Sequence, residues 1–345
     1  MIDTATYNVL LCGTQYGRVY LPAIFEAREL ELAAILARGS SRSVRIAEQS
    51  GVACYLSVAD LDIPVDLACV AIGGTTGMQT ALDLLKRKVP VLIEHPIGHE
   101  DCHLLLDTAT ANETVCHING HFADLPPAKD FTKISRILNR EHAPLVISGA
   151  ANTRTLYSML DLMMRSFGVF SIRELSVQPL GTDQNYISYN FNLKGTPVQL
   201  ILQNWKGEKD DSRDAPLGHQ LSVTYPTGTL HLTGTYGPCL WNPLVASIPN
   251  RTVPIALSGH ATAQATIAHI SDWRIKANQE AMSELTQCAG APGMIIEHQQ
   301  PEYLKALTTA WSTLIAEAKP VIRPDIPELI DQTYWTTQSI LSAEY

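Results

Sequence analysis

The sequence predicts an α/β protein: a doubly wound parallel sheet, followed by an α+β domain with an open, largely antiparallel sheet. Two patterns in the sequence indicate this fold class. From residue 7 to about residue 151, short apolar runs alternate with longer amphipathic ones, which is typical of parallel strands covered by helices on both faces. After about residue 172, apolar and polar residues alternate, as in 185–193, which is typical of antiparallel strands with one solvated face.

Six apolar runs are expected to form the strands of the first half, at 7–13, 30–38, 67–74, 89–94, 114–119 and 144–148. In the second half we expect strands at 185–193, 198–205, 221–225 and 229–236. The last two are joined by Pro226-Thr227-Gly228, a hairpin turn. The charged segment 207–214 is expected to be an exposed loop, and residues from 273 onward to be helical.

The expected domain boundaries are 1–122 for a Rossmann-type nucleotide-binding domain and 123–319 for the second domain. C-terminal helices at about 320–345 are expected to pack back on the first domain.

Composition excludes several classes of protein. Seven cysteines without a Cys-x-x-Cys pair predict neither a disulfide framework nor a metal site. A net charge of -9 without a dense basic block argues against nucleic acid. The chain has no apolar run long enough for a membrane span and no signal-like start, so we expect a cytoplasmic protein that acts on a small molecule or a protein partner.

The first strand runs into a glycine turn that predicts a dinucleotide site. A turn between a first strand and a first helix presents backbone N–H groups and the helix dipole to a pyrophosphate. The complete G-x-G-x-x-G pattern is absent, and the alternative is a tight structural turn. The candidate cofactor residues are Gly13, Thr14, Gln15, Tyr16 and Gly17.

Two further strand ends extend this prediction. After the second strand, Arg38, Ser40, Ser41 and Arg42 supply donors for a 2′-phosphate where NAD-specific proteins carry a carboxylate, which favours NADPH/NADP+ as cofactor. The alternative is a solvated loop in which a serine caps a helix. After the third strand, Gly73, Gly74 and Thr75 are small enough for a dinucleotide to lie close to the backbone.

The fourth and fifth strands end beside histidines. The fourth ends in Glu94-His95-Pro96, and Asn119 and His121 follow the fifth. Carboxyl ends of parallel strands meet at one edge, so His95 and His121 are expected to converge beside the glycine turn. His95 and His121 are the catalytic candidates, because imidazole exchanges protons near neutral pH, and Glu94, His95 and Asn119 are further cofactor candidates. The alternative is that a histidine at a strand end only packs.

The Glu-x-Pro sequence after such a turn resembles the glucose-fructose oxidoreductase and inositol dehydrogenase superfamily, which usually has Glu-Lys-Pro. A narrower resemblance is to the thiazolinyl imide (imine) reductases of yersiniabactin- and pyochelin-type siderophore assembly. It is carried by the stretches 12–22, 36–43, 94–96 and 117–126. This resemblance implies NADPH-dependent reduction of a thiazoline C=N to a thiazolidine, on an intermediate tethered to the carrier protein of a nonribosomal peptide synthetase. Superfamily analogy implies a homodimer formed through the outer face of the antiparallel sheet.

Reduction of an imine needs a hydride at carbon and a proton at nitrogen. The resemblance places a tyrosine as proton donor shortly after the fifth strand, where this chain has Phe122. Phenylalanine cannot donate, so His121, His95 or a water is expected to do so. Two other functions stay open: an NAD(P)-dependent sugar or polyol dehydrogenase, which would want lysine at position 95, and a dinucleotide-binding regulator without turnover.

Overall fold

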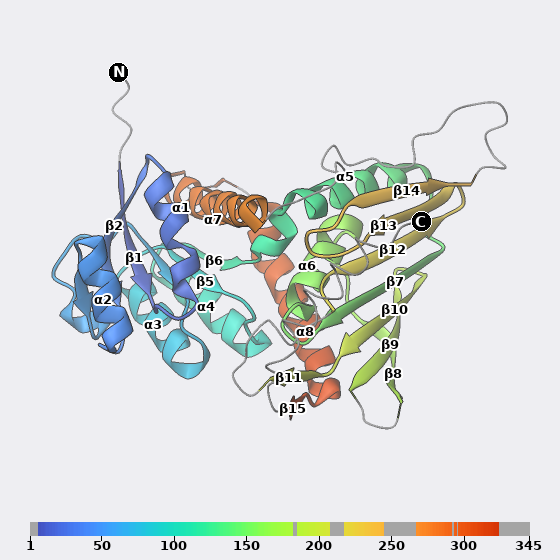
Figure 1. Ribbon diagram of the computed structural model, residues 1–345, viewed down its shortest axis with the longest axis horizontal. Helices are drawn as coiled ribbons and strands as arrows, with labels where there is room; N and C mark the ends of the chain where they lie inside the picture. Colours follow the sequence, from blue (N-terminus) through green and yellow to red (C-terminus); the bar gives the residue numbers. More distant parts are fainter. Residues whose placement is uncertain are drawn as a thin grey trace, which may run out of the picture. The chain divides into compact units, whose positions relative to one another are not determined.

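The computed structural model describes residues 6–181, 185–207, 217–244, 267–291, 293–294 and 296–323. The chain divides into two compact units, each drawn with its elements in Figure 1. Unit 1 comprises Met1–Lys129, Asp161–Val169 and Thr262–Thr309; unit 2 comprises Asp130–Leu160, Phe170–Ala261 and Ala310–Tyr345. The expected fold class, a parallel sheet followed by a mostly antiparallel one, is confirmed.

Unit 1 contains a six-stranded parallel sheet in the order β3-β2-β1-β4-β5-β6. The strands are β1 (Tyr7–Cys12), β2 (Leu30–Leu36), β3 (Ala53–Tyr55), β4 (Leu67–Val70), β5 (Val91–Glu94) and β6 (Cys116–Asn119). The chain leaves β1 toward β2 and β3 on one side and places β4, β5 and β6 on the other. Doubly wound folds bind their ligands at the carboxyl ends of the strands where the strand order reverses in this way.

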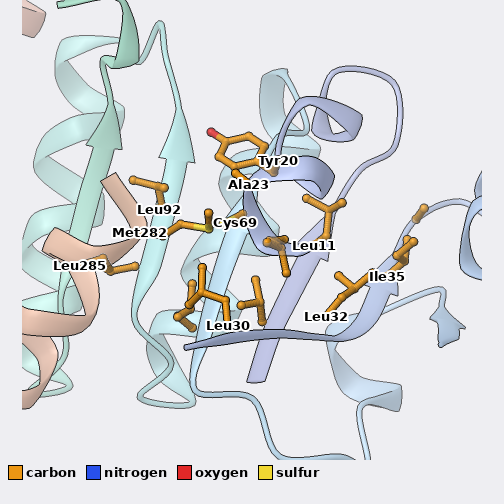
Figure 2. Packing of buried hydrophobic residues seen from close by; sticks show 14 of the residues in the cluster. Leu11, Tyr20, Ala23, Leu30, Leu32, Ile35, Cys69, Leu92, Met282 and Leu285 are labelled. Carbon is orange, nitrogen blue, oxygen red and sulfur yellow. The ribbon is translucent and has the colours of Figure 1, made fainter. Parts of the chain in front are cut away.

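Helices from both halves of the sequence complete unit 1. They are α1 (Leu21–Glu26), α2 (Ser41–Ser50), α3 (Gly74–Lys86), α4 (His99–Ala111) and α7 (Ile267–Gly290), with the short 3-10 segments η1 (Gly17–Val19), η2 (Val58–Asp60), η3 (His121–Asp124) and η6 (Glu297–Gln299). Figure 2 shows Met282 and Leu285 of α7 packed in one buried cluster with Leu92 and Cys69 of the sheet. The burial of this apolar face holds α7 against the parallel sheet.

Our sequence prediction assigned one strand to the wrong sheet. The run 144–148 corresponds to β7 (Val146–Asn152), which pairs with strands of the second sheet rather than extending the parallel one. The sixth place in the parallel sheet belongs to β3, which is three residues long and has no fully buried residue, so it gives no apolar run in the sequence.

Unit 2 contains a seven-stranded sheet in the order β14-β13-β12-β7-β10-β9-β8. Besides β7, its strands are β8 (Arg173–Leu180), β9 (Tyr186–Leu193), β10 (Thr196–Gln203), β12 (Gln220–Tyr225), β13 (Gly228–Leu232) and β14 (Cys239–Pro243). All neighbours are antiparallel except β7 and β10. The expected hairpin is confirmed, since Tyr225 pairs with Gly228 across the turn.

Three helices pass from one unit into the other along the chain: α5 (Pro126–Glu141), α6 (Leu156–Phe167) and α8 (Pro301–Ala318). Within unit 2, Tyr225 donates to Asn139 of α5 and Tyr189 donates to the Leu314 carbonyl of α8, at 3.0 Å and 2.7 Å. A small separate sheet joins β11 (Trp205–Gly207) to β15 (Val321–Arg323) in parallel. In the described part of the chain, no helix combines the length and apolarity needed to cross a bilayer.

The two compact units are not continuous in sequence, unlike the expected domains 1–122 and 123–319. Unit 1 extends to Lys129 and also takes 161–169 and 262–309. Most of the expected loop at 207–214 and residues 324–345 lie outside the described residues, so the packing of a C-terminal helix remains a prediction.

Candidate active site

The carboxyl ends of β5 and β6 bring together the two histidines that the sequence singles out. The strands are parallel neighbours, and Glu94 pairs with Asn119 at their ends. His95 and His121 follow within two residues, and their ring centroids lie 6.0 Å apart. The expected convergence of these side chains at one edge of the sheet is therefore confirmed, and all of it lies within unit 1.

A buried hydrogen-bond network holds Glu94 in place. The Tyr20 hydroxyl, which follows η1, donates to Glu94 Oε2. Asn119 Nδ2 donates to the Tyr20 hydroxyl at 2.5 Å and lies 3.3 Å from Glu94 Oε2. The same amide donates to Asn278 Oδ1 of α7 at 2.9 Å. The network thus connects Tyr20, the ends of β5 and β6, and α7.

His95 is fixed through Nδ1, which lies 2.6 Å from the Asn119 carbonyl oxygen and 3.1 Å from Glu94 Oε1. Burial acts to lower the pKa of His95, but the hydrogen bond and negative charge of Glu94 outweigh it, so the pKa of His95 is raised. Burial acts in the opposite direction on Glu94, yet His95, His121 and Tyr20 keep the pKa of that carboxyl below its usual range. Both shifts favour an imidazolium beside a carboxylate.

His121 has the opposite character. Its side chain is fully buried, its ring lies 4.2 Å from the Phe122 ring, and neither ring nitrogen has a hydrogen-bond partner among the described residues. Its backbone N–H donates to Asn119 Oδ1 at 3.1 Å. Burial, aided by the charges of His95 and Arg274 and opposed by Glu94, lowers the pKa of His121 to about 3. The pKa values of the two neighbouring histidines are therefore shifted in opposite directions, which separates their possible roles in acid–base chemistry.

Glu94, His95 and His121 also have possible metal-ligand atoms within 4.8 Å of one another. A carbonyl oxygen 2.6 Å from His95 Nδ1 requires a hydrogen on that nitrogen, so Nδ1 has no lone pair for a cation and only Nε2 of this ring could coordinate one.

The glycine turn has the backbone that the sequence predicts. Gly13 has φ +88°, and a Cβ there would lie 2.9 Å from the Ala71 carbonyl oxygen, so no other residue fits without a shift. Thr14 is buried, whereas Gln15 and Tyr16 are exposed. The turn leads into η1 at Gly17, and α1 begins only at Leu21.

The remaining cofactor candidates lie at the starts of α2 and α3. The Ser40 side chain caps α2 by accepting the Ser43 N–H at 3.2 Å, as the alternative interpretation expected. Arg38, Ser41 and Arg42 are exposed, and neither arginine has an ion pair within the described ranges. Gly73 precedes α3, which begins with Gly74 and Thr75, and a Cβ on either glycine would meet open space.

A buried ion network lies under the loop that carries His121. Arg165 of α6 binds Asp161 and, at 2.6 Å, Asp124; the Tyr303 hydroxyl donates to Asp161 at 2.6 Å. A Cβ at Gly120 would lie 2.6 Å from Asp161 Oδ2, so the loop packs directly on this network. The charge of Asp161 also contributes to raising the pKa of His95.

Sequence reasoning missed Tyr20, Asn278, Arg274 and this ion network. Tyr20 carried a weak signal, since it is a polar side chain at the start of an otherwise apolar helix close to the turn. Asn278 carried none, because it lies 159 residues from its partner Asn119.

Comparison with known families agrees with this geometry. Residues 7–120 match the family model described as the oxidoreductase family with NAD-binding Rossmann fold (GFO_IDH_MocA), and residues 142–242 match the model of the thiazolinyl imine reductase Irp3-like C-terminal domain. The chain belongs to the Gfo/Idh/MocA oxidoreductases and carries an Irp3-like C-terminal domain. The match over the first domain supports a nicotinamide dinucleotide as cofactor, and the assignment of Gly13–Gly17 to its binding stays a prediction. No curated protein matches the chain in sequence.

Solved structures share the fold at low identity. An oxidoreductase from Agrobacterium radiobacter in complex with NAD+, L-tartaric acid and magnesium has a TM-score of 0.68 at 13% identity, covering 91% of this chain and 96% of that one. Biliverdin reductase from Synechocystis, in complex with biliverdin and NADP+, has a TM-score of 0.65 at 12% identity, covering 90% and 98%. GenD2 from gentamicin A biosynthesis, in complex with NAD, has 0.65 at 14%, covering 91% and 95%.

Proposed function

We propose that this reductase uses NADPH to reduce a thiazoline C=N to a thiazolidine on a carrier-tethered siderophore intermediate in the cytoplasm. The observation that carries the proposal is His95: the superfamily usually has lysine here, and this chain has an imidazole whose Nδ1 is held between Glu94 and the Asn119 carbonyl. A cationic imidazole suits a substrate whose nitrogen must be protonated.

In the proposed reaction the residues of the chain orient the reactants and supply the proton. The glycine turn and the starts of α2 and α3 hold the dinucleotide, which supplies the hydride when bound. As the imine carbon is reduced, its nitrogen gains negative character and takes a proton from His95. With Nδ1 committed to Asn119, the proton leaves from Nε2, and the Glu94 carboxylate stabilises the imidazolium before transfer.

The other proton-donor candidates fit less well. Phe122 has no acidic proton, and His121 is neutral at pH 7 because its pKa is about 3. His121 instead contributes an uncharged imidazole to the same site, and the Phe122 ring packs against it. The missing tyrosine of the family pattern is thus replaced by His95 rather than by its neighbour in sequence.

The function is tested by following NADPH oxidation with a synthetic aryl-thiazoline ester, beside parallel assays with NADH and with a polyol plus NADP+. We expect turnover with the thiazoline and NADPH. Turnover with the polyol alone would instead make the protein a sugar dehydrogenase with a variant Glu-His-Pro motif, and cofactor binding without any turnover would make it a regulator.

NADPH is preferred over NADH in this proposal because Arg38 and Arg42 are exposed beside the capped start of α2. We expect Arg42→Gln to raise the Michaelis constant for NADPH by roughly tenfold, since a hydrogen bond to a charged group contributes about 1.5–3 kcal/mol, and to leave that for NADH nearly unchanged. Arg45→Gln, one turn later on the same helix, is the matched control. Equal losses with both cofactors would rule out 2′-phosphate recognition.

The proposed partner is the acidic carrier protein that bears the substrate. Lys133, Arg136 and Arg140 are exposed at spacings of three and four residues, which places them on one face of α5 beside Ile137, itself 51% exposed. In a chain with net charge -9 this basic face fits an acidic partner. We also propose a homodimer, by superfamily analogy.

Docking is tested by comparing the tethered and free substrates. We expect Lys133→Glu with Arg140→Glu to lower kcat/KM for the carrier-tethered thiazoline and to leave the free ester unaffected. Lys86→Glu, at an exposed position on α3, is the control for the change of charge. A matching loss with the free ester would show that α5 does not serve as the docking surface.

A further inference from the structure

Arg274 of α7 has no carboxylate partner among the residues that the structure describes. It is partly buried, and its Nε has no solvent contact and no hydrogen-bond acceptor within those residues. The nearest carboxylate along its own helix, Asp272, pairs instead with Lys276 at 2.8 Å. A buried N–H that loses water without gaining an acceptor costs free energy, so the Nε of Arg274 calls for a ligand.

Two features of the site surround Arg274. On one side, Arg274 Nη2 lies 3.5 Å from the hydroxyl of Tyr16, which belongs to the glycine turn. On the other, the charge of Arg274 acts on His121 and contributes to its lowered pKa. His121 has two more buried nitrogens without a partner among the described residues. Arg274 and His121 together therefore have three buried nitrogens without a partner among the described residues, and Arg274 also contacts the turn through Tyr16.

Other contacts fix the backbone of α7 around Arg274. Asn278, one turn later on α7, donates to the Arg274 carbonyl at 2.9 Å and accepts from Asn119 at the end of β6. Gln279 donates to the Ala23 carbonyl of α1 at 3.1 Å. These bonds connect the backbone of α7 to β6 and to α1, so they fix the helix from which the Arg274 side chain extends.

We propose that Arg274 binds a phosphate group at the glycine turn. The planar guanidinium fork matches phosphate oxygens with paired donors, and the backbone N–H groups of the turn favour an anion at the same place. Two sources of this phosphate are chemically equivalent: the pyrophosphate of the nicotinamide dinucleotide, and the phosphate of a phosphopantetheine arm that carries the substrate. Only the second source rests on the proposed function.

The experiment measures NADPH and NADH dissociation constants by fluorescence titration of the full-length protein without substrate. For a cofactor phosphate we expect Arg274→Gln to weaken both dinucleotides roughly 10- to 100-fold, as for loss of hydrogen bonds to a charged group. Arg274→Lys should be intermediate, because it keeps the charge and loses the fork. Dinucleotide affinity should also become less sensitive to salt.

For an arm phosphate, the dissociation constants stay unchanged, and the Michaelis constant rises for the carrier-tethered thiazoline but not for the free ester. Lys276→Gln removes a charge from an exposed position on the same helix and is the matched control, and the melting temperatures of all variants report on folding. If both Arg274 variants keep dinucleotide and tethered-substrate affinities within twofold of wild type, the assignment is wrong. The binding measurement needs no turnover, so it stands even if thiazoline reduction fails.

Discussion

Replacing His95 with alanine is expected to lower kcat for thiazoline reduction by roughly 10²- to 10⁴-fold, the range for loss of a general acid. NADPH affinity should change little, because the proton donor acts on the substrate nitrogen. The measurement is steady-state kinetics together with an NADPH titration of the variant. An unchanged kcat would remove His95 from the mechanism.

The pH dependence gives an independent check of the same role. The pKa of His95 is raised by Glu94, so the acid is present below that pKa and is lost as the pH rises through it. We therefore expect activity to fall on the alkaline side. Glu94→Gln removes the negative charge that raises the pKa of His95 and leaves only a neutral hydrogen-bond acceptor, so the fall should begin at lower pH. In His95→Ala this alkaline limb should disappear, leaving a low, flat rate.

Replacing Arg165 with methionine is expected to lower the free energy of unfolding by about 3–5 kcal/mol, as for removal of one partner from a buried ion network. Asp161 and Asp124 would be left as two buried carboxylates with no cation between them, and the remaining Tyr303 hydrogen bond neutralises neither. Burial already acts to raise the pKa of Asp124, and Arg165 is the chief group that opposes it.

Urea denaturation measures this loss. Arg140→Met is the matched control, because the same substitution at an exposed position should change the free energy of unfolding by no more than about 0.5 kcal/mol. Adding Asp124→Asn and Asp161→Asn to Arg165→Met should restore part of the stability, since the buried charges are then gone. A loss below about 1 kcal/mol for Arg165→Met would mean that the network contributes little.

The sequence alone was sufficient for five of the six strands of the parallel sheet and for the pairing of its two histidines. The apolar runs of β1, β2, β4, β5 and β6 are long enough to be recognised, and the carboxyl ends of parallel strands share an edge by geometry. His95 and His121 follow neighbouring strands, so their approach needed no knowledge of distant contacts. The glycine of the turn was recognisable for the same reason, because a positive φ is a local requirement at Gly13.

Only the tertiary structure decided what those residues do. The run at 144–148 is apolar in either sheet, and its neighbours β10 and β12 determine where it lies. The two histidines have equal ordinary pKa values, and they differ here because the hydrogen bond and charge of Glu94 outweigh burial at His95, whereas burial outweighs the charge of Glu94 at His121. Asn278 and Arg274 reach the site from α7, more than 150 residues after β6. Side-chain burial and contacts between distant segments arise on folding, and no local pattern in the sequence records them.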